Sequence, residues 1–218
     1  MPELNVDTPR GPARVHLTLP DGSPPRAGLM LGHGAGGGVG APDLQAARGA
    51  ALRAGLTVAL VEQPYRVAGR RSPAPAAHLD EAWVAVAEQL AADRLRGLPI
   101  IAGGRSSGAR VACRTAAAID AAGVLCLAFP LLPPRRAGAA KPPVSRLAEL
   151  DAVTVATLVV QGVNDRFGMP PEAPGRTVAR VAGDHALRSD LPAVAEAVTQ
   201  WLQTQRRGRR RSARAARS

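Results

Sequence analysis

The chain has 218 residues, 46% of them hydrophobic, and a formal net charge of +11. This length suits one domain with a large core. No apolar run approaches the roughly 20 residues that a membrane-spanning helix needs, and the polar start after Met1 lacks the apolar segment of a secretory signal. We therefore expect a cytoplasmic protein with no membrane contact, in which Cys113 and Cys126 are buried thiols and not a disulfide.

The positive charge is concentrated at the C-terminal end of the chain. Seven of the charges come from arginines after Gln205, which leaves about +4 for the rest; these are Arg206, Arg207, Arg209, Arg210, Arg211, Arg214 and Arg217. No aromatic residue is interleaved with them. We expect a single domain over residues 1–205, followed by a disordered arginine-rich tail over 206–218 that binds nucleic acid or another polyanion weakly.

Apolar strand-like segments alternate with amphipathic helical ones along the chain. The expected strands cover residues 14–19, 26–31, 56–62, 98–102, 124–129, 157–162 and 177–181. The expected helices cover residues 43–54, 79–95, 107–121 and 190–205. After an initial hairpin-like pair, this order predicts an α/β fold: a doubly wound, mostly parallel sheet with helices on both faces. No second domain and no internal repeat is indicated.

One turn joins a predicted buried strand directly to a predicted helix. Residues 104–108 read G-R-S-S-G, with Ser106 at the centre. In this strand–turn–helix setting, a G-x-S-x-G sequence is typical of a nucleophile elbow, in which a strained backbone holds the serine hydroxyl above the sheet edge. The glycines avoid collisions with the neighbouring strand and helix. The alternative is an ordinary glycine turn whose serine caps the helix.

Two further polar residues follow later strands of the same predicted sheet. Asp165 comes after strand 157–162, and His185 comes after strand 177–181. Because ligands of open α/β sheets collect at the carboxyl ends of the strands, Ser106, Asp165 and His185 should meet at one edge. We interpret them as nucleophile, acid and base of a catalytic triad. Asp184 is the competing acid, but a side chain directly next to His185 rarely faces its ring.

A glycine-rich segment, H-G-A-G-G-G over residues 33–38, follows the predicted strand 26–31. Oxyanion holes use backbone N–H groups from such a loop and from the residue after the nucleophile. The candidates here are Ser107, together with Gly34 or Ala35. A phosphate-binding loop is the alternative, but the lysine–serine pair and the spaced acidic residue of nucleotide sites are missing.

The motifs LGHGAGGG, EQPYRVAGRRSPAP, GGRSSGAR, FPLLPP, QGVNDRFG and GDHALR together resemble the small α/β-hydrolases without a cap domain that are related to dienelactone hydrolase. More narrowly, they resemble the group that includes a subunit of a histone-acetyltransferase NSL complex and a testis-expressed protein. The resemblance covers about residues 26–202. It implies a minimal α/β-hydrolase fold with Ser106, Asp165 and His185 as the triad.

These observations predict a serine hydrolase that acts on a small carboxylic ester or thioester through an acyl-enzyme, with no metal and no cofactor. Tyr65, Arg70 and Arg105 are the candidate substrate-binding residues. Several arginines fall near the predicted active edge, where they form either a solvated surface or a cationic rim for anionic esters; they are Arg66, Arg70, Arg71, Arg105, Arg110, Arg135 and Arg136. The other function class is a non-catalytic interaction module whose basic tail binds polyanions.

Overall fold

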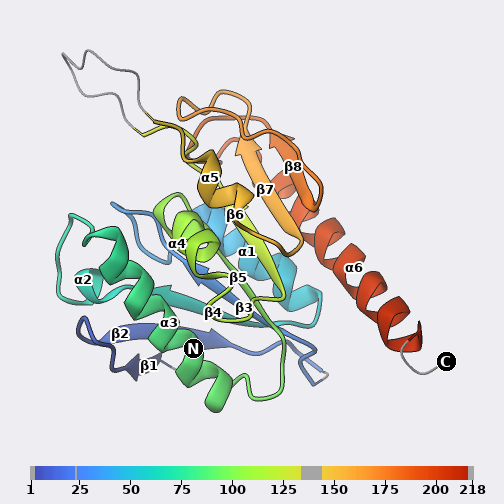
Figure 1. Cartoon of the computed structure of the whole chain (residues 1–218), viewed down its shortest axis with the longest axis horizontal. Helices are drawn as coiled ribbons and strands as arrows, with labels where there is room; N and C mark the ends of the chain where they lie inside the picture. Colours follow the sequence, from blue (N-terminus) through green and yellow to red (C-terminus); the bar gives the residue numbers. More distant parts are fainter. Residues whose placement is uncertain (1–2, 23, 134–143, 216–218) are drawn as a thin grey trace.

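Eight strands form one sheet in the described part of the chain, residues 3–22, 24–133 and 144–215 of a computed structural model (Figure 1). Their order in the sheet is β1-β2-β4-β3-β5-β6-β7-β8. The strand β2 runs antiparallel to β1 and to β4. The strands β3, β4, β5, β6, β7 and β8 are parallel to one another. The bounds are β1 Glu3–Val6, β2 Ala13–Thr18, β3 Gly28–Gly32, β4 Thr57–Glu62, β5 Ile100–Arg105, β6 Gly123–Leu127, β7 Thr157–Gly162 and β8 Arg176–Val181.

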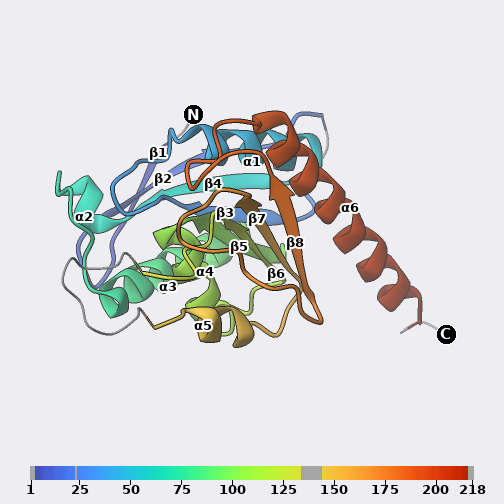
Figure 2. The same cartoon turned by 90° about the horizontal axis from the view of Figure 1, so that it is seen from above.

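Helices cover both faces of this sheet, as the view from above shows (Figure 2). The bounds are α1 Pro42–Arg53, α2 Pro64–Val67, α3 Ala76–Ala92, α4 Ser107–Thr115, α5 Leu147–Asp151 and α6 Leu191–Ala215. Successive strand side chains point to opposite faces, so Met30 packs in the core beneath α3 and α4, while Leu29 and Leu31 pack with α1 and α6. The predicted doubly wound sheet is therefore confirmed. None of the helices in the described ranges has the length and apolar character needed to cross a membrane.

The expected hairpin between residues 14–19 and 26–31 is wrong. The antiparallel partners of β2 are β1, which the sequence analysis missed, and β4, whereas β3 lies between β4 and β5. All five residues of β3 are buried. A strand that is apolar on both faces is stabilised at the centre of the sheet beneath both helical layers, not in an edge hairpin.

The C-terminal helix also differs from expectation. We predicted a disordered tail from residue 206, but α6 continues without a break to Ala215. Arginine and alanine are good helix formers, and no proline interrupts them. The packed first half of α6, which includes Val194, Val198 and Leu202, supplies the nucleus from which the helix propagates. Residues 216–218 of the predicted tail lie outside the described residues.

Three glycines allow β3, β5 and α4 to approach one another closely. A Cβ atom on Gly108 would lie 2.4 Å from the carbonyl oxygen of Gly32, and one on Gly104 would lie 2.6 Å from the same oxygen. A Cβ on Gly32 would in turn contact the ring of Trp83 at 3.2 Å and Gly108 Cα at 3.3 Å. The neighbours of Gly104 and Gly108 are backbone atoms, which cannot rotate away, so the predicted need for glycine on both sides of Ser106 is confirmed.

We expect Gly108→Ala to lower the free energy of unfolding by about 2 kcal/mol or more, because the added methyl group collides with the Gly32 carbonyl. Gly49→Ala is the matched control, since Gly49 also lies in a helix and its Cβ would meet only the end of the Arg53 side chain, at 3.3 Å. The free energy of unfolding of Gly49→Ala should rise by up to about 1 kcal/mol, because alanine has the higher helix propensity. Urea denaturation measures both, and equal midpoints for the two variants would contradict the packing argument.

Candidate active site

The side chains of Ser106, Asp165 and His185 meet at the carboxyl ends of three parallel strands. They follow β5, β7 and β8 respectively. The Ser106 hydroxyl donates to His185 Nε2 over 2.9 Å, and His185 Nδ1–H donates to Asp165 Oδ2 over 2.8 Å. The chain of hydrogen bonds therefore runs from a hydroxyl through an imidazole to a carboxylate whose side chain is fully buried.

Ser106 occupies a strained backbone conformation. Its φ is +52° and its ψ is −106°, a combination that residues with a Cβ rarely adopt. The Ser106 amide donates to the Leu127 carbonyl of β6 over 2.9 Å, which fixes the turn against the neighbouring strand. Ser107 is the first residue of α4, so its amide lies in the helix N-terminal turn beside the Ser106 hydroxyl.

Asp165 is held by donors on both carboxylate oxygens. Oδ1 accepts the Phe167 backbone N–H over 2.9 Å, and Oδ2 accepts Gln161 Nε2–H over 2.8 Å in addition to the His185 ring. Gln161 is fully buried in β7, and no sequence pattern singles it out as a partner of Asp165. The competing acid Asp184 is exposed, and its Oδ1 accepts the Ala186 N–H. Of the two carboxylates, Asp165 is thus the one that is hydrogen-bonded to the His185 ring.

An open cleft of about 490 Å³ contains Ser106 and His185. Its lining consists of small and apolar groups, the two catalytic candidates, Ser107 and four arginines; in full it comprises Ala35, Gly36, Pro73, Arg105, Ser106, Ser107, Arg110, Pro130, Arg146, Arg166, Phe167 and His185. The Phe167 ring meets the His185 ring edge-on, with centroids 4.5 Å apart. Within the described residues, no group of three or more His, Cys, Asp or Glu side chains is arranged to hold a metal ion.

Comparison with known protein families matches residues 25–189 to the model of the alpha/beta hydrolase domain. The chain belongs to this α/β-hydrolase family. No curated protein matches it significantly.

Solved structures share the fold of this hydrolase at low sequence identity. A lidless α/β serine hydrolase from Xanthomonas campestris is 22% identical with a TM-score of 0.74, and the match covers 93% of this chain and 94% of that one. Est1E from Butyrivibrio proteoclasticus is 16% identical with a TM-score of 0.74, covering 94% and 99%. A dienelactone hydrolase from Anabaena variabilis is 16% identical with a TM-score of 0.70, covering 93% and 96%. Like the first of these, this hydrolase has no cap domain in its described residues.

The glycine-rich loop of this hydrolase is fixed by His33. Gln63 N–H donates to His33 Nε2 over 3.1 Å, so this nitrogen carries no proton. His33 Nδ1 is therefore protonated and donates to the Gly34 carbonyl over 2.8 Å; the Gly37 N–H donates to the same carbonyl over 3.2 Å. The C=O and N–H of a trans peptide point in opposite directions. The Ala35 N–H consequently points away from the donors that hold Gly34, and Ala35 itself lines the cleft.

Two of the expected substrate-binding residues lie elsewhere. Tyr65 is buried, and its hydroxyl donates a hydrogen bond to the Ala35 carbonyl over 2.9 Å. It therefore supports the glycine-rich loop and does not line the cleft. Tyr65 and Arg70 line a second pocket of about 160 Å³, not the cleft that holds Ser106. Arg70 is thus not among the residues that line the cleft at Ser106, and its predicted role in substrate binding stays a prediction.

Arg105, the third expected substrate residue, lines the cleft but is held by protein groups. Its Nε lies 2.8 Å from Asp43 Oδ2, and its Nη2 donates to the His185 carbonyl over 3.1 Å. Asp43 is fully buried in the first turn of α1, and burial raises the pKa of its carboxyl, although Arg105 opposes the rise. Arg105 thus connects α1 to the loop that carries His185, a positioning contact that no local pattern indicates.

Burial lowers the pKa of His33 below its ordinary value of 6.5. The unfolded chain then binds a proton more readily than the folded one, so the stabilising contribution is present above pH 6.5 and is lost as the pH falls from there toward the lowered value. We expect the free energy of unfolding to decline more steeply between pH 7 and pH 5 in the wild type than in His33→Asn. Denaturant titration across this range measures the difference, and parallel curves would rule out this role for His33.

Proposed function

We propose that this α/β-hydrolase hydrolyses a small carboxylic ester or thioester through an acyl-enzyme. Ser106 Oγ attacks the acyl carbon while His185 Nε2 takes its proton, and Asp165 stabilises the resulting imidazolium. His185 then returns the proton to the departing alcohol or thiol. Water, activated by the same ring, attacks the acyl-serine ester, and the acid and free Ser106 are released.

The observation that supports this proposal is the continuous hydrogen-bond chain from Ser106 through His185 to Asp165 at an open cleft. The developing oxyanion is assigned to the N–H groups of Ser107 and Ala35. Backbone donors of this kind are preorganised, because α4 fixes the first and the contacts of His33 and Tyr65 fix the second. Without a cap, the cleft suits small or flexible substrates.

The motifs quoted above also support membership of the narrower group that resembles the NSL-complex subunit and the testis-expressed protein. That likeness is the basis for the alternative function, a non-catalytic interaction module. Two features favour the enzyme. The backbone strain lies at Ser106, the proposed nucleophile, and both nitrogens of the His185 ring and both oxygens of the Asp165 carboxylate make hydrogen bonds. An interaction module requires neither.

A fluorophosphonate probe should label the wild-type protein at neutral pH and fail to label Ser106→Ala, because labelling needs an activated serine hydroxyl. Hydrolysis of 4-nitrophenyl acetate should fall by about 10³-fold or more in Ser106→Ala and His185→Gln, and by less in Asp165→Asn.

Ser72→Ala is the matched control for this experiment, since Ser72 is exposed on the loop before α3. It should be labelled at the wild-type rate. An unlabelled wild type that is folded by circular dichroism would contradict the proposed activity.

We also propose a second function for the end of α6. Figures 1 and 2 show this helix running away from the sheet toward the C-terminus. From Gln205 to Ala215 its sequence contains six arginines and no acidic or aromatic residue. A helical arm of this composition fits the phosphate backbone of nucleic acid. It lacks the bulky apolar residues with which amphipathic helices enter a lipid surface.

Deleting residues 206–218 should abolish binding to duplex DNA in low salt and leave ester hydrolysis unchanged, because the packed part of α6 ends near Leu202. Wild-type binding should weaken steeply with salt, with a slope of about 0.9 per phosphate contacted. Fluorescence anisotropy measures the binding. If ester hydrolysis falls together with DNA binding, the arm belongs to the active site.

A further inference from the structure

The cleft that holds Ser106 is lined by positive charge alone. Arg105, Arg110, Arg146 and Arg166 line it, and no Asp or Glu does so among the described residues. Two of these arginines are neutralised by protein carboxylates. Arg105 pairs with buried Asp43, and Arg110 donates through two nitrogens to Glu149, one of these contacts being 2.9 Å long. The charge that remains comes from Arg146 and Arg166.

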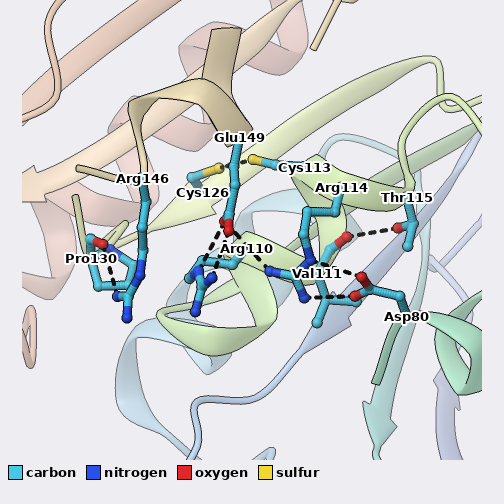
Figure 3. Close-up of polar contacts among 10 residues, drawn as sticks. All are labelled: Asp80, Arg110, Val111, Cys113, Arg114, Thr115, Cys126, Pro130, Arg146 and Glu149. Carbon is cyan, nitrogen blue, oxygen red and sulfur yellow. Dashed lines mark hydrogen bonds and ion pairs between the residues drawn. The ribbon is translucent and has the colours of Figure 1, made fainter. Parts of the chain in front are cut away.

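Arg146 stands at the end of a row of charged side chains (Figure 3). Asp80 accepts from Arg114 over 2.6 and 2.8 Å, Arg114 also reaches Glu149 over 3.4 Å, and Glu149 in turn accepts from Arg110. Signs alternate up to this point. Arg146 comes next to Arg110, so two cations are neighbours, and the row contains three guanidinium groups against two carboxylates.

No carboxylate pairs with Arg146 in the part of the chain that the structure describes, and its one side-chain hydrogen bond there runs from Nη1 to the Pro130 carbonyl over 3.1 Å. The residues outside the description, 1–2, 23, 134–143 and 216–218, include no Asp and no Glu. They therefore supply no acidic side chain. Burial, the adjacent Arg110 and, more weakly, Arg114 lower the pKa of Arg146, while Glu149 opposes them. Among the residues that the structure describes, a half-buried cation is thus left without a counter-charge at the wall of the cleft.

We propose that Arg146, with Arg110 beside it, binds a carboxylate or phosphate group of the substrate while the ester carbonyl lies at Ser106. The inference rests on the proposed esterase function and adds a substrate class to it: esters or thioesters that carry a second, anionic group. The Nε and Nη2 edge of Arg146 makes no hydrogen bond within the described residues, and such an edge matches two oxygens of one anion. Arg166, which also lines the cleft, is exposed and lies over the Phe167 ring, 4.9 Å from its centroid, so it adds attraction for an anion.

The test compares matched pairs of activated esters at constant ionic strength. The anionic members are the mono-4-nitrophenyl esters of succinate, glutarate and adipate, and each neutral partner has the free carboxylate converted to an amide. A third arm replaces the carboxylate with a phosphonate. If Arg146→Gln lowers kcat/KM more for the phosphonate ester than for the carboxylate ester, the natural ligand group is a phosphate; if it lowers kcat/KM more for the carboxylate ester, the group is a carboxylate. The variants are Arg146→Gln, Arg146→Lys and, as control, Arg94→Gln, which removes an exposed arginine paired with Asp93.

We expect kcat/KM of the wild type to favour the anionic ester by at least about tenfold for one chain length. Arg146→Gln should remove this preference, chiefly through KM, and should lower kcat/KM for the neutral ester far less than for the anionic one. Arg146→Lys should keep part of it, and Arg94→Gln should behave like the wild type. The inference is overturned if the ratio of kcat/KM for the anionic and neutral esters is the same in Arg146→Gln as in the wild type. If both values fall in parallel, Arg146 only supports the Pro130 carbonyl.

A direct binding measurement separates this inference from the esterase proposal. Calorimetry with mono-4-nitrophenyl succinate on Ser106→Ala should give binding that is at least about tenfold weaker once Arg146→Gln is added. This result would support the anion site even if the wild type hydrolyses no ester. Equal affinity in the two proteins would overturn it even if the wild type is an active esterase.

Discussion

The close contact between the Gly32 carbonyl at the end of β3 and the glycines on both sides of Ser106 is the constraint on which the site depends. It brings α4 directly against the central strands. The turn between β5 and α4 must then be completed in a single residue, and Ser106 takes a positive φ as a result. The same contact places the start of the glycine-rich loop next to the serine. The proposed nucleophile and the proposed oxyanion donors are therefore fixed by one packing arrangement.

The second constraint is electrostatic. Arg105, which directly precedes the serine, lies between a fully buried Asp43 on α1 and the carbonyl of His185. A buried ion pair is weak evidence for stability, because both charges lose hydration. Its value here is geometric, since a guanidinium group with partners on two elements holds the histidine loop at a defined distance from the elbow. Gln161 does the same for Asp165 from within β7.

Charge is distributed over the hydrolase in two separate places. The arm of α6 carries most of the excess, while the cleft keeps a smaller surplus at Arg146 and Arg166. The surplus in the cleft differs in kind from that of the arm. Arg146 lies beside the compensated Arg110 and is partly removed from water, so an ionic contact there is stronger than at a solvated helix. A small anion and a long polyanion would thus bind at different places on one chain.

Sequence alone determined the alternation of strands and helices, the position of the G-x-S-x-G turn and the order in which Ser106, Asp165 and His185 appear along the chain. These are local patterns, or follow from the rule that parallel strands end at one edge. It could not determine that β3 is central, because both a central strand and a buried hairpin strand are apolar. Nor could it separate Arg146, which faces the cleft, from Arg70, which faces another pocket. Both are arginines on loops, and only the path of the folded chain decides which pocket each of them lines.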